Sequence, residues 1–112
     1  MAFEQWSENL LVGELSDDPQ FTDDLTAIIE HCTDNTRTDV LLDFSGVSHL
    51  NSSNIAKLLK LRKLSMISNE RRLKLCSINR HVWGVFLVTG LDKIFEFADD
   101  KPSGIASLQL GE

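Results

Sequence analysis

The 112-residue chain is 42% hydrophobic and carries a formal net charge of −6. This length and composition predict one globular domain with a hydrophobic core, residues 1–112, and no second domain. The negative charge argues against non-specific nucleic-acid binding, and no apolar run is long enough for membrane insertion. The segment Met1 to Leu10 has no signal-peptide features, so we expect a cytoplasmic protein.

The N-terminal part predicts a hairpin followed by a helix. Strands are expected from Ala2 to Trp6 and from Leu10 to Leu15, joined by a polar turn and therefore antiparallel. Asp17-Asp18-Pro19 predicts the helix start, because a carboxylate can cap the first turn and proline lacks only a free N–H. The polar run 33–38 predicts a loop. The buried helix face consists of residues at helical spacing, namely Phe21, Leu25, Ile28, Ile29 and Cys32.

The stretch from Asp39 to Leu64 contains a strand, a tight connection and a helix in succession. Val40 to Phe44 is an apolar run typical of an inner strand, and Gly46 is expected in the turn. The helix should begin within one or two residues of Ser52, where a serine or asparagine can cap it. Arg62 interrupts the apolar stripe of this helix. Either its stem packs while its guanidinium reaches the rim, or the helix buries a different arc that includes Leu61 and Leu64.

The C-terminal third predicts two more strands and two more helices. Leu73 and Leu75 alternate with polar residues, as in a strand with one better-buried face. A helix containing Val82 and Phe86 follows, and Ile94 to Phe97 reads as the last strand. Asp100 then starts a final helix, which we expect to be short or frayed because its apolar stripe is partial.

The order of these elements predicts the fold class. Strands that alternate with helices between Val40 and Phe97 require right-handed crossovers and hence parallel pairing. With the N-terminal antiparallel hairpin, the fold is α/β, with a mixed, mostly parallel sheet of about five strands and about four helices. Such sheets present their functional edge at the carboxyl ends of the parallel strands, where residues 51–54 fall.

The segment from Asp43 to Leu61, DFSGVSHLNSSNIAKLLKL, resembles the signature of the STAS domain, the module of sulfate transporters and anti-sigma factor antagonists. Val88 to Phe95 resembles the corner before the last strand of the same family, so the resemblance covers nearly the whole chain. In antagonists regulated by phosphorylation, the modified serine directly follows an aspartate. That position is Ser52 here, with Ser53 as the second candidate, and Asn51 stands in place of the acid.

The resemblance also implies a partner and a binding surface. As an anti-sigma factor antagonist, the chain would bind an anti-sigma factor that is itself a serine kinase, and so regulate transcription. The alternative is a STAS module that is never phosphorylated and serves interaction or ligand sensing in a transport or stress-signalling complex. Asn54, which replaces a family glycine, and Asn51 favour this alternative. The expected partner-binding residues are Asn51, Ser52, Ser53, Asn54, Lys57 and Lys60.

Basic residues gather after position 56 in a chain that is acidic before it. They form either a solvated face or a docking surface for an acidic partner. The members of this basic cluster are Lys57, Lys60, Arg62, Lys63, Arg71, Arg72 and Lys74.

Enzymatic chemistry is not indicated. His31, His49 and His81 have no metal-site spacing, and the GxSxG elbow of a hydrolase using Ser52 is absent. No phosphate-binding glycine loop occurs either. Cys32 and Cys76 lie in apolar patterns without CxxC spacing, which predicts buried free thiols. We therefore expect a non-enzyme without cofactor or metal. The oligomeric state is open.

Overall fold

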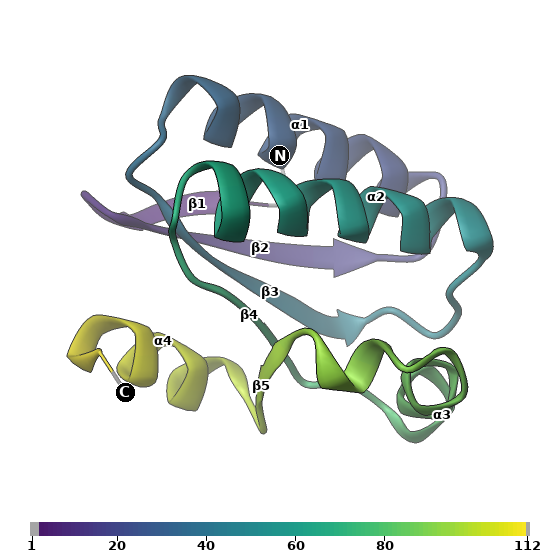
Figure 1. Cartoon of the computed structure of the whole chain (residues 1–112). Helices are drawn as coiled ribbons and strands as arrows, with labels where there is room; N and C mark the ends of the chain where they lie inside the picture. Colours follow the sequence, from purple (N-terminus) through teal and green to yellow (C-terminus); the bar gives the residue numbers. More distant parts are fainter. Residues whose placement is uncertain (1–2, 112) are drawn as a thin grey trace.

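A computed structural model describes residues 3–111 as a five-stranded sheet with helices on both faces (Figure 1). The strands are β1 (Phe3–Ser7), β2 (Leu10–Ser16), β3 (Asp39–Gly46), β4 (Leu73–Cys76) and β5 (Glu96–Ala98). The helices are α1 (Gln20–Asp34), α2 (Ser52–Arg62), α3 (Arg80–Thr89) and α4 (Lys101–Leu110). A π-helical segment, Lys63–Ser68, continues α2, and a 3-10 turn, Leu91–Lys93, follows α3.

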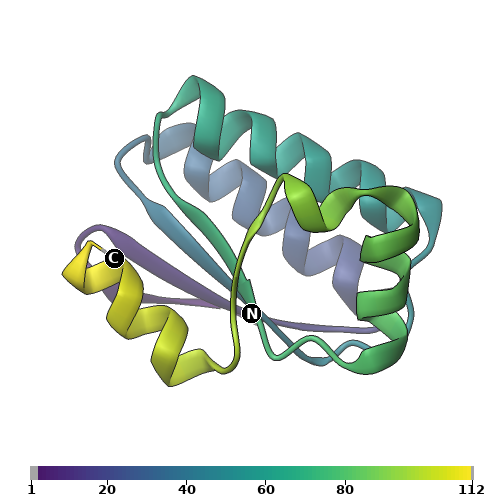
Figure 2. The same ribbon diagram turned by 60° about the horizontal axis from the view of Figure 1, so that its bottom comes forward.

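The sheet has the order β1-β2-β3-β4-β5, with β1 antiparallel to β2 and all other neighbours parallel. The mixed sheet with an N-terminal hairpin is therefore confirmed, except that Ala2 lies outside the described residues. Helices α1 and α2 lie side by side on one face, and α4 lies on the other (Figures 1 and 2). No helix within residues 3–111 is long and apolar enough to cross a membrane.

Two hydrophobic cores follow from the alternation of side chains along β3. Val40, Leu42 and Phe44 face α1 and α2 in the larger core, where the Phe44 ring makes edge contacts with aromatic rings of α1 and α3. Leu41 faces α4 in the smaller core. Both faces of β3 are thus buried, as the continuous apolar run predicted.

The final helix is longer and better packed than expected. It runs from Lys101 to Leu110, and the Asp100 carboxylate caps it by accepting the Ser103 N–H at 2.9 Å. Gly104 explains the difference, because a Cβ at this position would lie 2.7 Å from a methyl carbon of Leu41. The residue that lowers helix propensity is therefore the one that lets α4 approach the sheet closely.

Three further boundaries differ from the sequence-based expectation. Helix α1 continues to Asp34, so the predicted loop 33–38 begins two residues later, and Thr38 within it is buried. Strand β5 begins at Glu96 and not at Ile94 as expected, because the 3-10 turn Leu91–Lys93 ends directly before Ile94. Strand β4 is buried on both faces, because α4 covers Lys74, which is only 6% exposed.

Helix α2 combines the two arrangements considered for Arg62. Leu61 is fully buried while Leu59 is 38% exposed, so the buried arc is rotated away from the simple apolar stripe. The Arg62 side chain nonetheless packs inward, since its Nε donates to the carbonyl oxygen of Ile94 at 3.0 Å. The guanidinium therefore ties α2 to the segment that leads into β5.

Candidate functional site

The segment that joins β3 to α2 lies at the edge of the sheet where β2 and β3 end (Figure 1). Gly46 is the last residue of β3 rather than part of the turn. A Cβ on Gly46 would lie 2.8 Å from the carbonyl oxygen of Leu15, so glycine allows the two strand ends to approach. We call residues 47–54, which include the first turn of α2, the joint.

A reciprocal capping box starts α2. The Asn51 side-chain oxygen accepts the Asn54 N–H at 2.8 Å, and the Asn54 side-chain oxygen accepts the Asn51 N–H at 3.1 Å. The helix begins at Ser52, as the sequence predicted, but Ser52 is not the cap. Two asparagine amides fill the roles that a serine and a glutamate have in the common form of this motif.

The carboxylate of Asp18, at the start of α1, is hydrogen-bonded to both side chains of this capping box. One carboxylate oxygen accepts the side-chain N–H groups of Asn54 at 2.9 Å and of Asn51 at 3.2 Å. The other accepts the N–H and the hydroxyl of Thr22. The Thr22 and Asn54 hydrogen bonds lower the pKa of Asp18 to about 2, because they favour the charged form. A single carboxylate thus fixes the first turns of α1 and α2 together.

Asp17 and Asn79 hold the loop that precedes Asn51. The Asp17 carboxylate accepts the Ser48 hydroxyl, the Ser48 N–H at 2.8 Å and the His49 N–H at 3.2 Å. The bonds from Ser48 lower the pKa of Asp17. From the other side, the Asn79 amide donates to the carbonyl oxygen of Val47 at 2.8 Å. Side chains from two other segments therefore hold this loop in one conformation.

The joint presents Ser52 and Ser53 to solvent. Both residues are exposed, and neither hydroxyl forms a hydrogen bond within residues 3–111. Asn51 is also exposed, whereas Asn54 is only 3% exposed and lies beneath the helix start. In this conformation Asn54 supports the joint and does not present its side chain to a partner.

The family of this protein follows from its sequence and its fold together. The family model described as STAS domain matches residues 16–103, which include the joint and every element from α1 to β5. The chain belongs to the STAS domain family. A comparison with curated proteins found no match.

This STAS domain shares its fold, at low sequence identity, with several solved structures. Some of these are anti-sigma factor antagonists. An anti-sigma factor antagonist (STAS) domain protein from Planctomyces limnophilus is 17% identical with a TM-score of 0.81, over 96% of this chain and 97% of that one. Unphosphorylated SpoIIAA, an anti-sigma factor antagonist, is 18% identical with a TM-score of 0.79, over 98% and 96%. The phosphorylated form of Bacillus SpoIIAA is 17% identical with a TM-score of 0.65, over 86% and 88%.

The basic cluster of the STAS domain divides into two groups, apart from Arg62, whose Nε donates to the carbonyl oxygen of Ile94. Arg71 and Arg72 form ion pairs with Asp39 and Glu96, and the buried Lys74 ammonium donates to the hydroxyl of Ser107. These residues lie at β4 and stabilise the fold. The remaining lysines are on α2 and its continuation, where Lys60 and Lys63 are exposed and Lys57 is half-buried. These three lysines lie on the helix that begins at the joint and on its continuation, and the residues at β4 do not.

The histidines and cysteines of the STAS domain offer no assembled reactive group. His49 is an exposed loop residue whose ring meets that of His81 at 5.7 Å, and no hydrogen bond within residues 3–111 joins it to Ser52. No group of three metal-binding side chains occurs in that part of the chain. Cys32 and Cys76 are buried free thiols, as predicted, and burial raises the pKa of both to about 11.

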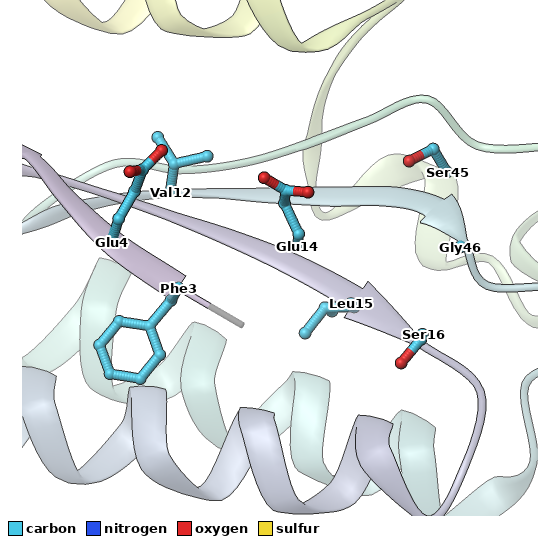
Figure 3. Close-up of a pocket in the computed structure, with 8 residues that line it drawn as sticks. All are labelled: Phe3, Glu4, Val12, Glu14, Leu15, Ser16, Ser45 and Gly46. Carbon is cyan, nitrogen blue, oxygen red and sulfur yellow. The ribbon is translucent and has the colours of Figure 1, made fainter. Parts of the chain in front are cut away.

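A cavity of about 470 Å³ opens beside β1, β2 and β3 (Figure 3), and neither Ser52 nor Ser53 lines it. Glu4, Glu14 and Ser45 point to the α4 side of the sheet, and Phe3 points to the α1 side. The Glu14 carboxylate is 2.9 Å from the Lys101 ammonium. This polar cavity includes none of the joint's residues.

The sequence located the joint but not the groups that hold it. Asp17 and Asp18 were recognised only as a helix start, and Asn79 was not connected with the joint. Their roles depend on β2, β3 and β4 ending side by side, which becomes visible only once the strand order is known.

Proposed function

We propose that this STAS domain is an anti-sigma factor antagonist that binds an anti-sigma factor in the cytoplasm and so regulates transcription. The observation that carries the proposal is the Ser52 hydroxyl, which is exposed and free of hydrogen bonds within residues 3–111. It sits on a helix start held by Asp17 and Asp18, so a partner would meet a rigid surface. The chain acts by binding and not by catalysis.

Phosphorylation of Ser52 is the proposed switch. A phosphate adds about −1.5 to −2 charges at neutral pH. The capping box uses the N–H of Asn54, while the N–H groups of Ser52 and Ser53 have no acceptor within residues 3–111. Free N–H groups and the helix dipole favour a negative charge at this position, so the fold tolerates it. A charge of this size inside an interface is opposed by desolvation, and binding is lost.

The proposed partner is a serine kinase with an acidic docking surface. Lys57 and Lys60 follow the two serines on α2, and neither forms an ion pair within the described part of the chain. The fold shared with SpoIIAA, which is known in unphosphorylated and phosphorylated forms, supports this reading. Position 51 lacks the acid of the family pattern. The Asp18 carboxylate, which is hydrogen-bonded to the Asn51 side chain, supplies a negative charge next to this position and so partly replaces that acid.

The second candidate is a STAS module that is never phosphorylated and serves interaction or ligand sensing in a larger complex. One observation favours it. The side chains of Asn51 and Asn54 are engaged with each other and with Asp18, so the two positions that depart from the family pattern have a structural role. A kinase that reads an aspartate before the serine would find an amide there instead.

Three variants at the serines test the proposal. Ser52→Ala should still bind the anti-sigma factor, because it removes neither a cap nor a charge. Ser52→Asp should bind much more weakly. Ser53→Asp is the matched control and should have a milder effect, since Lys57 lies one helical turn from Ser53 and can neutralise the new charge.

The binding partner and the phosphate are detected in one experiment. The chain is used to capture partners from cells of its own organism, and the intact mass of the captured chain is measured before and after incubation with ATP. A captured anti-sigma kinase, with one phosphate that maps to Ser52 and is absent in Ser52→Ala, supports the switch. Stable capture without any phosphate on Ser52 would favour the second candidate.

A further inference from the structure

The outward surfaces of α1 and α2 carry opposite charges. These helices lie side by side on the same face of the sheet (Figure 1). Asp23, Glu30 and Asp34 are exposed on α1, and Lys60 and Lys63 are exposed on α2 and its continuation. None of these five side chains forms an ion pair within residues 3–111. An acidic ridge thus runs beside a basic ridge without being neutralised by it.

The two ridges are level along the helix axes. The Asp18 carboxylate bonds to the N–H of Thr22 on α1 and to the side chain of Asn54 on α2, so both helices start at the same height. With a rise of 1.5 Å per residue, Glu30 lies about 15 Å along α1, while Lys60 and Lys63 lie about 12 and 16 Å along α2. Glu30 therefore lies level with the two lysines, whereas Asp23 and Asp34 lie closer to the two ends of α1.

We propose that this helix layer, the outward surface of α1 and α2, binds a second copy of the chain face to face. A two-fold axis parallel to the helices places α1 of one copy against α2 of the other, twice in the same interface. Every acidic ridge then meets a basic ridge. Ile67, which is 60% exposed on the continuation of α2, lies on the basic ridge and is covered in this arrangement. A two-fold axis that lies in the interface plane but runs perpendicular to the helices would instead place α1 against α1 and α2 against α2. Like charges would then lie opposite each other.

The complex is a salt-sensitive homodimer, because exposed charges at short range provide much of the attraction. The layer includes Ser53 and Lys60, which belong to the proposed docking surface. Self-association and partner binding therefore exclude each other, and the dimer would be a form of the chain that cannot bind the partner.

Sedimentation velocity over a range of protein concentrations tests the proposal. The wild-type chain should dimerise at low ionic strength, about 0.01 M, where the Debye length is about 30 Å, and dissociate at about 1 M, where it is about 3 Å. Lys60→Glu with Lys63→Glu should weaken dimerisation by at least about tenfold, since the two-fold axis repeats each lost pair. The matched control, Arg80→Glu with Lys93→Glu, makes the same charge change at exposed residues outside the layer and should dimerise like the wild type.

A charge swap separates this geometry from general electrostatic repulsion. Asp23→Lys with Glu30→Lys gives a layer whose exposed charges are basic except at Asp34, and Lys60→Glu with Lys63→Glu gives a layer whose exposed charges are all acidic. Each variant alone should be monomeric, and an equimolar mixture should form a heterodimer. Thermal unfolding of each variant confirms that it is folded. A wild-type chain that stays monomeric at low salt, a mixture that stays monomeric, or a Lys60/Lys63 variant that dimerises normally would each overturn the proposal.

Discussion

The position of the helix cap at the joint gives a prediction that separates Asn51 from Ser52. Asn51→Ala removes the oxygen that accepts the Asn54 N–H and the amide that donates to Asp18. Loss of an N-cap costs about 0.5 to 2 kcal/mol, and we expect the upper half of that range because two hydrogen bonds are lost. Ser52→Ala removes no hydrogen bond within residues 3–111 and should change the free energy of unfolding by less than about 0.5 kcal/mol.

Urea denaturation followed by circular dichroism measures this difference. In a domain of this size about 1 kcal/mol corresponds to a shift in melting temperature of about 4 °C or more, so thermal scans give a second readout. Asn51→Ser is the control, because serine keeps a capping oxygen but loses the contact to Asp18; it should recover most of the lost stability. If Ser52→Ala destabilised the chain as much as Asn51→Ala, the assignment of the cap would be wrong.

Three other predictions concern the docking surface, the α4 packing and the Asp18 contact. Lys57→Glu with Lys60→Glu should weaken capture of the partner and reduce its salt dependence without lowering the melting temperature; unchanged capture would return these lysines to a solvated face. Gly104→Val should cost about 1 to 3 kcal/mol in urea denaturation, whereas Gly84→Ala, with open space around it, should not destabilise. The lowered pKa of Asp18 contributes stability above its ordinary pKa that is lost as the pH falls toward about 2, so Asp18→Asn should flatten this part of the pH–stability profile.

The fold was predictable because its signals are local and repeated. The apolar run from Val40 to Phe44 and the helical spacing from Phe21 to Cys32 each agree with the buried residues of the structure. The alternation of strands and helices then left few topologies, since parallel crossovers are right-handed. Local sequence was misleading where tertiary contacts determine the length or the burial of an element. Gly104 lets helix α4 approach Leu41 closely, and Lys74 is buried because α4 covers it.

The candidate site was predictable in position and only partly in its chemistry. Polar residues after an inner strand marked the joint, and Ser52 and Ser53 are exposed there. The sequence could not show that Asn54 is buried or that Asp18 contacts it, because these residues lie 36 positions apart. In the same way, Arg71 appeared to belong with the lysines of α2 until its ion pair with Asp39 placed it at β4.

The three-way contact of Asp18 with Asn51 and Asn54 constrains how the joint can evolve. An Asn51→Asp change, which restores the family acid, would put a second carboxylate where the amide nitrogen now lies 3.2 Å from Asp18. An Asn54→Gly change, which restores the family glycine, would remove a donor to Asp18 and the acceptor of the Asn51 N–H. The effects of such replacements should be strongly non-additive. A series of mutations that converts this joint into the common family sequence is therefore expected to include a change at Asp18.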